Sequence, residues 1–392
     1  MSAPAAVPAR RGLAVLFSVV IVDLIGFGIV MPALPFWARE FGADATTLGL
    51  LQSSYAIAQF LCAPLWGRLS DRVGRRPVLL GTIAGTALAL LAVGVAPSLA
   101  WLFVARILAG AFAANVSVAS AYIADVTAPE ERTRWMGMLG ASFGVGFVLG
   151  PALGGLLEPF GHAVPMLVAA GLAALNWLFA LARLVEPERH ERRTPGAGRL
   201  SVLRAPTLRT IVLVNLVFSI AVTQLETLFA FFMMDRFRWD MRGVGFVLAG
   251  MAIVMGGIQG GGMKALSARH VERTLVMAGT WLLALGFAGL PLAPSVAWLL
   301  LPLLLAAVGR AIAQPALQSL VSLAARPEQR GMVMGAFQSS ASLARVVGPP
   351  LGGLLYDLAL PAPFWLASAL LLGVALAARA LPRGAEATPG IG

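Results

Sequence analysis

The chain has 392 residues, of which 59% are hydrophobic and 12% are charged, and its formal net charge is +11. Soluble domains carry roughly 25% charged residues, so this composition excludes a soluble globular protein and indicates an integral membrane protein. The positive charges lie in short loops between apolar segments, so we expect them to contact anionic lipid headgroups and expect no nucleic-acid partner. The single cysteine, Cys62, excludes an intrachain disulfide.

Twelve apolar segments are long enough to cross a bilayer as helices, which takes about 20 residues each. In chain order they cover residues 12–37, 46–66, 77–95, 98–124, 135–157, 162–184, 208–234, 243–263, 274–293, 296–324, 331–356 and 361–381. The first is longer than the core of a signal peptide, so we expect a retained membrane helix. The sequence therefore predicts an all-α membrane protein with 12 transmembrane helices.

Lysine and arginine residues are distributed unevenly across the predicted membrane. Of the 29, four lie on one side and three lie inside predicted spans, which leaves 22 on the side that carries both termini. By the positive-inside rule that side is cytoplasmic. We therefore expect a multi-pass protein of a bacterial-type inner (plasma) membrane with both termini in the cytoplasm.

The longest hydrophilic segment, residues 185–207, separates six predicted spans from six. It contains charged residues, proline and glycine, and is interpreted as a cytoplasmic linker. The expected domains are an N-terminal six-helix bundle at 1–184 and a C-terminal six-helix bundle at 208–392.

The two halves also share sequence. Residues 150–157, GPALGGLL, recur as GPPLGGLL at 348–355, and PEER at 129–132 recurs as PEQR at 327–330. In each case the second copy begins 198 residues after the first. A common offset indicates that a six-helix unit was duplicated, which predicts two pseudo-symmetric bundles.

Residues 67–80, GRLSDRVGRRPVLL, place four arginines and one aspartate between two apolar runs. A charged hairpin of this kind cannot lie within hydrocarbon and must sit at a membrane surface. With the two six-helix halves and the middle linker, it resembles the loop 2-3 signature of the major facilitator superfamily, G-x-L-x-D-R-x-G-R-R-x-x-L. Residues 121–155 resemble the tetracycline/proton antiporter type of 12-helix drug exporters.

The resemblance implies a cytoplasmic gate. Its residues would be Gly67, Asp71, Arg72, Gly74, Arg75, Arg76 and Asp125. Asp71 would face the amino terminus of the eleventh helix, and one of the arginines would pair with Asp125. The simpler alternative is that Asp71 offsets the neighbouring positive charges in a solvated loop.

A second set of residues resembles the antiporter signature of drug exporters: Gly146, Gly150, Pro151, Gly154 and Gly155. Small residues four apart allow helices to approach closely, and proline removes one backbone hydrogen bond. Because the pattern recurs at 348–353, close packing alone is the alternative interpretation.

Two acidic residues lie deep in predicted spans, Asp23 and Glu226. An ionisable side chain at that depth is costly, by about 2.5–3.5 kcal/mol on insertion scales, so both are candidate proton carriers. Arg106 lies in a segment that resembles the family pattern R-x-x-Q-G, with Ala109 in place of the glutamine. If Arg106 pairs with Asp23, it would hold that carboxylate deprotonated. The alternative for either acid is a structural ion pair or hydrogen bond.

Polar residues at helical spacing mark four candidate faces of a substrate cavity. They are Gln52, Tyr55 and Gln59; Asn215, Ser219 and Thr223; Arg310, Gln314 and Gln318; and Gln338, Ser342 and Arg345. Each stripe could instead form hydrogen bonds between helices.

The sequence contains no nucleotide-binding loop, metal-ligand spacing or nucleophile motif, so we expect no enzyme activity, cofactor or metal. We expect a monomeric proton-coupled secondary transporter that exports hydrophobic or amphipathic drug-like compounds, tetracycline-like ones included, by alternating access. Its partners would be the small-molecule substrate, protons and membrane lipids. The main alternative is proton-coupled uptake of a small metabolite; a passive facilitator and a non-transporting receptor are the others.

Overall fold

The computed structural model describes most of the chain as α-helix, and within the described residues there is no β-strand. The described ranges are 7–127, 129–187, 205–325 and 329–381. Most of the predicted linker lies outside these ranges, as does the start of the PEQR sequence at 327–330.

The chain forms two compact units. As far as residues are described, unit 1 comprises Met1–Ala43, Ser54–Arg193 and Trp239–Gly250, and unit 2 comprises Asp44–Ser53, Thr194–Arg238 and Met251–Gly392. The units follow the two halves of the sequence except at two short segments, residues 44–53 and 239–250. Each of these belongs to the unit formed mainly by the other half.

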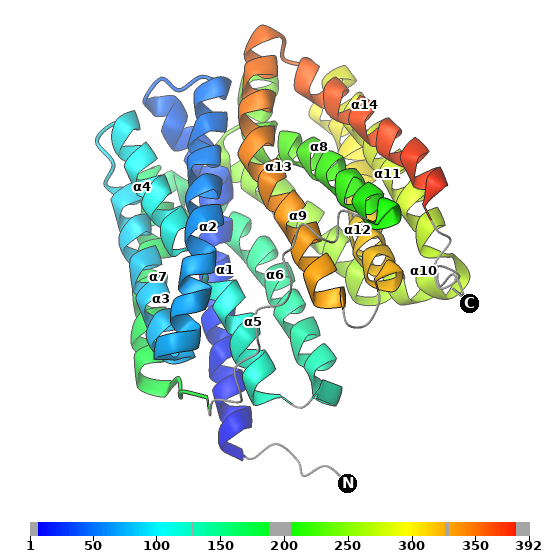
Figure 1. Cartoon of the computed structure of the whole chain (residues 1–392). Helices are drawn as coiled ribbons and strands as arrows, with labels where there is room; N and C mark the ends of the chain where they lie inside the picture. Colours follow the sequence, from blue (N-terminus) through cyan, green and yellow to red (C-terminus); the bar gives the residue numbers. More distant parts are fainter. Residues whose placement is uncertain (1–6, 128, 188–204, 326–328, 382–392) are drawn as a thin grey trace, which may run out of the picture. The chain divides into compact units, whose positions relative to one another are not determined.

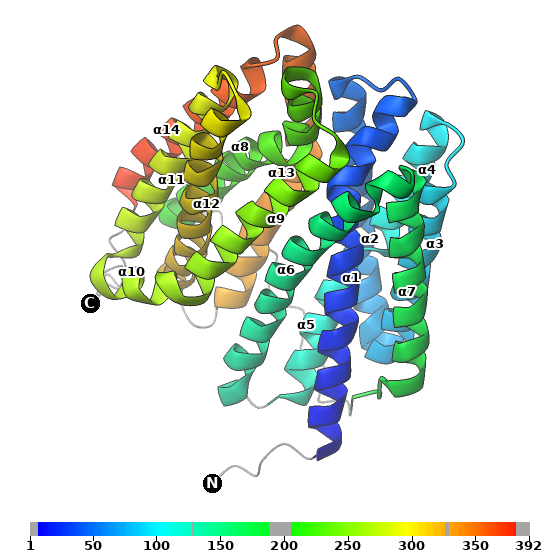
Figure 2. The same cartoon turned by 180° about the vertical axis from the view of Figure 1, so that it is seen from behind.

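Unit 1 is built around α1, which packs between α6 and α7 (Figure 2). Its helices are α1 Val7–Glu40, α3 Arg75–Gly94, α4 Leu99–Phe112, α5 Asn115–Val126, α6 Pro129–Leu157 and α7 Ala163–Arg183, with a short 3-10 turn η1 at Glu158–Phe160. Helix α3 packs on α4, α5 and α7. Most of α2, Ala45–Val73, and the start of α9, Met241–Gly257, also belong to this unit.

Unit 2 contains α8, which packs on α13 and α14, and α11, which packs on α12 and α14 (Figure 1). Its helices are α8 Pro206–Phe237, α10 Met263–Arg269, α11 Glu272–Gly289, α12 Val296–Ala324, α13 Arg330–Leu358 and α14 Ala362–Ala377. Short segments are the π-helical η3 Ile258–Gly262 and the 3-10 turns η4 Leu290–Leu292 and η6 Ala378–Ala380.

Within the described residues, eleven helical segments are long and apolar enough to cross a membrane, and two of them contain more than one α-helix. The eleventh predicted span, 331–356, forms the 29-residue helix α13, which is not among these segments. Polar residues in its middle, at positions 338–345, lower its mean hydropathy. The all-helical membrane fold expected from the sequence is confirmed.

Two local expectations were wrong. The charged segment is not a loop hairpin, because α2 continues to Val73 and α3 begins at Arg75. Only Gly74 separates them, with a φ of 115° that favours glycine. The fourth predicted span is one transmembrane segment but not one helix, since α4 ends at Phe112 and α5 begins at Asn115.

Glycines set how closely the helices approach. A Cβ added at Gly28 in α1 would lie 2.6 Å from the carbonyl oxygen of Gly146 in α6, and one added at Gly150 would lie 2.5 Å from the Cα of Gly28. In a bilayer, apolar burial gives little net drive for association, so close van der Waals contact has to hold helices together. The glycines therefore decide where α1 lies against α6.

Candidate functional site

Asp23 lies midway along α1, next to the break between α4 and α5. Asn115, the first residue of α5, donates a hydrogen bond from Nδ2 to Oδ1 of Asp23, with a distance of 2.7 Å. The side chain of Asn115 is buried, and its Oδ1 has no hydrogen-bond partner among the described residues. Asn115 is thus the direct partner of the candidate proton carrier.

Side chains of α2 stabilise the break between α4 and α5. Gln59 donates from Nε2 to the carbonyl of Ala113 at 3.1 Å, and Trp66 donates from Nε1 to the carbonyl of Ala111 at 2.6 Å. A helix break inside a membrane span leaves backbone groups that need partners within the protein. Gln59, predicted as a cavity residue, therefore has a structural hydrogen bond here.

Arg106 does not pair with Asp23. Its guanidinium carbon lies 4.3 Å from the centroid of the Tyr55 ring, and the residue is 4% exposed. The ion pairs between described residues do not include Asp23 with Arg106. The carboxylate is hydrogen-bonded to α5, whereas the guanidinium stacks on α2, so the two predicted partners have different neighbours.

In unit 2, Glu226 of α8 forms an ion pair with Arg310 of α12. The Nε of Arg310 also lies 3.4 Å from Oε1 of Gln314, one turn along. Both members of the ion pair are partly exposed. A predicted proton carrier and two predicted cavity residues thus come together, and Glu226 takes the ion-pair arrangement that was its structural alternative.

Arg75 joins the charged residues at the ends of α2 and α5. Its Nε lies 2.7 Å from Oδ2 of Asp125, and its Nη1 lies 2.6 Å from Oδ1 of Asp71. Nη1 also donates to Oγ of Ser70 at 2.6 Å. Among the predicted gate residues, Arg75 is therefore the arginine that pairs with Asp125.

Glu186 completes this cluster from the segment after α7. Its carboxylate accepts hydrogen bonds from the backbone N–H groups of Arg75, at 2.7 Å, and Arg76, at 2.9 Å. These are the first two N–H groups of α3, so Glu186 binds the positive end of the helix dipole. The side chain of Arg76 donates in turn to the carbonyl of Leu181 at 2.8 Å. The linker is thereby attached to the charged segment.

The small-residue sequence of α6 has two faces. Gly146, Gly150 and Gly154 lie against α1, where added Cβ atoms would meet Leu24, Gly28 and Ile29. Pro151 and Gly155 lie against the start of α9, where a Cβ added at Gly245 would come within 2.5 Å of the Pro151 carbonyl oxygen. Every member of the set therefore takes part in close helix packing.

The predicted polar stripes differ in exposure. Asn215 is buried and donates from Nδ2 to the Phe337 carbonyl at 3.0 Å and to Ser340 Oγ at 2.8 Å, so it joins α8 to α13. Thr223 is also buried and bonds within its own helix, and Ser342 bonds within α13. Four polar residues remain exposed: Gln314, Gln318, Gln338 and Arg345. Gln52, Tyr55, Ser219 and Ser342 are partly buried.

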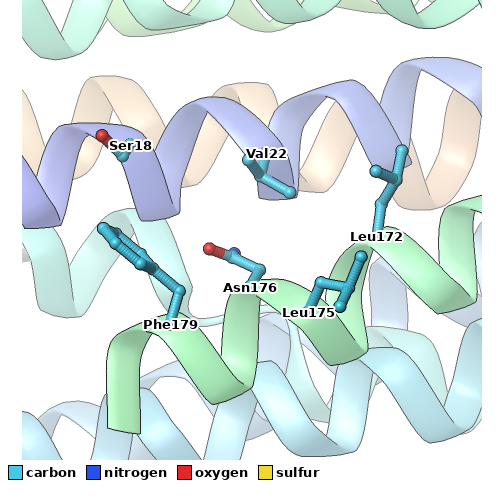
Figure 3. A pocket seen from close by; sticks show the side chains of 6 residues that line it. All are labelled: Ser18, Val22, Leu172, Leu175, Asn176 and Phe179. Carbon is cyan, nitrogen blue, oxygen red and sulfur yellow. The ribbon is translucent and has the colours of Figure 1, made fainter. Parts of the chain in front are cut away.

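A cavity of about 200 Å³ lies between α1 and α7, as Figure 3 shows. Its lining residues are Ser18, Val22, Leu172, Leu175, Asn176 and Phe179. The amide of Asn176 points towards α1 and donates to the Val19 carbonyl at 2.9 Å. This cavity is mainly apolar and includes none of the predicted substrate-cavity residues.

Comparison with known proteins decides the family. The family model of the Major Facilitator Superfamily matches residues 16–269 and 263–391. The chain belongs to the Major Facilitator Superfamily. It is 35% identical to the class C tetracycline resistance protein of Escherichia coli over 384 residues, covering 95% of this chain and 96% of that protein. With the class D tetracycline resistance protein of Salmonella ordonez it is 34% identical, covering 92% and 94%.

Among solved structures, the human organic anion transporter MFSD10 (TETRAN) is similar, with a TM-score of 0.72 and 29% identity. The match covers 95% of this chain and 99% of that one. As a major facilitator, the protein is a membrane transporter for a small molecule and not an enzyme. This confirms the family, fold and class of function expected from the sequence.

Sequence reasoning missed Asn115 and Glu186. Asn115 lies in the pattern Asn115-Val116-Ser117, which looks like a glycosylation site, and only the helix break places its amide on Asp23. Glu186 lies at the start of a segment that was read as a linker. The available signal for Glu186 was an acidic residue two positions after a predicted span, with a backbone that Pro187 restricts to extended conformations.

Arg75→Ala is expected to reduce transport several-fold, because it leaves Asp71 and Asp125 without the cation that joins them. Arg68→Ala, at an exposed position near the end of the preceding helix α2, is the matched control and is expected to retain transport. The measurement is substrate export from cells with equal amounts of each variant in the membrane. Equal export by the two variants would contradict a gating role for Arg75.

Proposed function

We propose that this protein is a proton-coupled exporter of hydrophobic or amphipathic drug-like compounds, with tetracycline-like molecules among its substrates. The relatives at 34–35% identity are tetracycline resistance proteins and match over more than nine-tenths of the chain. The observation that carries the proposal is the acidic side chain of Asp23 within α1, held by a buried amide beside a broken helix. Transmembrane carboxyl groups of this kind are typical of proton relays.

Asp23 is the proposed proton carrier, and Asn115 is its proposed switch partner. When Asp23 is ionised, it accepts a hydrogen bond from Asn115 Nδ2. When it is protonated, its O–H needs an acceptor, and the buried Asn115 Oδ1 is an acceptor that has no donor among the described residues. A rotation of one amide can thus serve both protonation states. Arg106, stacked on Tyr55, supplies a positive charge to the same unit.

The proton gradient supplies the work. Each proton that moves inward releases about 2.3 kcal/mol per 100 mV of membrane potential, in addition to the pH term. The polar residues that remain exposed on α12 and α13, Gln314, Gln318, Gln338 and Arg345, are the proposed contacts of the substrate. Polar side chains within spans favour an aqueous cavity over lipid.

We also propose that the protein acts as a monomer in an inner (plasma) membrane with both termini cytoplasmic. The excess of Lys and Arg on the side of the termini supports this orientation. The charged cluster around Arg75 would then be the cytoplasmic gate. The N-terminal end of α2 would lie on the opposite side.

The test uses inside-out membrane vesicles energised by respiration, whose lumen becomes acidic. Adding a substrate of an exporter should drive protons out of the lumen, read with a pH-sensitive dye, for tetracycline-like and other amphipathic drugs. An uptake symporter would give no such signal on addition of drug. If no compound in a broad panel moves protons, drug export is wrong; if substrate accumulates after the gradient is collapsed, proton coupling is wrong.

A further inference from the structure

Asp357 at the end of α13 binds the amino terminus of α2. Its Oδ1 accepts a hydrogen bond from the backbone N–H of Ala45 at 3.1 Å. Its Oδ2 accepts one from the N–H of Thr46 at 2.8 Å and one from Oγ1 of Thr46 at 2.6 Å. Asp44, the residue before α2, accepts from the N–H of Thr47 at 2.8 Å. Two carboxylates therefore satisfy the first three N–H groups of α2, one of them from more than 300 residues away.

Asp357 lies at the C-terminal end of its own helix, where an acidic side chain is unfavourable. It is the second-last residue of α13, where the negative end of the helix dipole disfavours an acidic side chain. The positive end of α2 reverses that cost only while α2 is in place. A residue that is unfavourable in its own helix and favourable in one contact makes that contact a switchable one.

Directly beside this cap, α2 and α13 touch backbone to backbone. A Cβ added at Gly49 would lie 2.2 Å from the Pro349 carbonyl oxygen, and one added at Gly353 would lie 2.1 Å from the Ala45 carbonyl oxygen. One turn further, Ser53 donates from Oγ to the carbonyl of Val346. The backbones approach closely here, and the carboxylate of Asp357 caps the start of α2 at one end of this contact.

The N-terminal half has the same close helix packing, but it has no acidic residue at the position equivalent to Asp357. In unit 1, Gly245 of α9 lies on Pro151 of α6 as Gly49 lies on Pro349. The position equivalent to Asp357, 198 residues earlier, is Pro159. The start of α9 is capped locally instead, since Gly243 N–H donates to Asp240 Oδ1 at 2.8 Å. Packing alone therefore does not require the acid, and Asp357 adds something specific to the α2–α13 contact.

We propose that Asp357 is a gating residue, whose carboxylate latches the amino terminus of α2 to α13 and controls opening on the non-cytoplasmic side. The proposal rests on the orientation and alternating access of the proposed function. The first turns of α2, Asp44–Ser53, belong to unit 2, and the remainder, from Ser54, belongs to unit 1. Release of the first turns is then the step that lets α2 move as one helix with unit 1.

The test measures access to the latch directly. In a Cys62→Ala background, Ser53→Cys is the only cysteine, and its labelling by a membrane-impermeant maleimide added outside intact cells reports opening between α2 and α13. Asp357→Ala is expected to raise the initial labelling rate about ten-fold, since it removes a charged helix cap. Asp357→Asn keeps one acceptor oxygen. Its labelling rate is expected to lie between the rate with Asp357 intact and the rate of Asp357→Ala. Asp240→Ala, which removes the local cap of α9, is the matched control and should leave the rate unchanged.

A double variant separates a latch from a folding defect. Thr46→Val removes one of the three hydrogen bonds and should raise labelling less than Asp357→Ala does. The combination Asp357→Ala with Thr46→Val should label no faster than Asp357→Ala alone, because both changes act on one contact. Unchanged labelling in Asp357→Ala, or an additive effect in the double variant, would overturn the proposal. Labelling needs neither drug nor protons, so an absence of drug-driven proton movement in the unmodified protein would refute the proposed function and leave this result intact.

Discussion

Asp23→Asn is expected to abolish drug-driven proton movement and to reduce drug resistance to the level of cells without the protein. Asparagine has nearly the size of aspartate and can still bond to Asn115, but it cannot take up or release a proton. The change therefore removes the proposed carrier without opening a cavity in α1. The measurement is the pH-dye signal in inside-out vesicles, normalised to the amount of protein in the membrane.

The matched control for this prediction is Asn176→Ala. Asn176 also ties a neighbouring helix to α1, through its 2.9 Å hydrogen bond to the Val19 carbonyl, about one turn from Asp23. Its loss disturbs the packing of α1 and leaves the carboxyl group in place, so coupling should persist. Asn115→Ala should weaken coupling without abolishing it, because the carboxyl remains but loses its hydrogen bond. Proton movement by Asp23→Asn at the unmodified rate would exclude Asp23 as the carrier.

The fold could be predicted from the sequence because membrane helices need length and apolarity, and both are local properties. The predicted span 296–324 has the same bounds as α12. The charged segment was wrongly expected to be a loop. Charged residues show where the chain leaves the hydrocarbon, but they do not show where a helix ends. Residues Arg68 to Arg72 can be solvated on a helix that projects beyond the hydrocarbon, and only Gly74 has a backbone conformation that requires a turn.

The candidate site was harder to predict, because pairing depends on which turns of distant helices meet. Asp23, Arg106 and Glu226 were identified by the cost of burying charge, which sequence alone reveals. The sequence did not reveal which residues they contact. Asp23 contacts Asn115, and Arg106 contacts Tyr55. Glu226 contacts Arg310. The two-residue break between α4 and α5 sets the rotation of α5, and no proline or glycine in the sequence at 113–114 marks it.

Gly150→Ala is expected to destabilise the protein, although alanine is the better helix former. The added Cβ would lie 2.5 Å from the Cα of Gly28 and 2.8 Å from the carbonyl oxygen of Ile25. Both are backbone atoms that can move only if α1 moves, and overpacking of this kind costs about 1–3 kcal/mol. The measurement is the midpoint of thermal unfolding in detergent, which should fall by several degrees.

Gly144→Ala on the same helix is the matched control. A Cβ at this position meets no heavy atom within 4 Å. It should therefore show the gain in helix propensity, about 1 kcal/mol for alanine over glycine, without a clash. The two variants are expected to shift the midpoint in opposite directions, and equal shifts would mean that α1 and α6 are less closely packed than the structure has them.

The same pair of variants tests what the small-residue sequence is for. If it serves packing alone, Gly150→Ala lowers the amount of folded protein, and each folded molecule still couples drug export to protons. If it has a separate role in antiport, coupling per folded molecule falls in Gly150→Ala and not in Gly144→Ala. Because every member of the set contacts α1 or α9 in the structure, we expect the first result: stability falls, and the number of protons moved per drug molecule does not change.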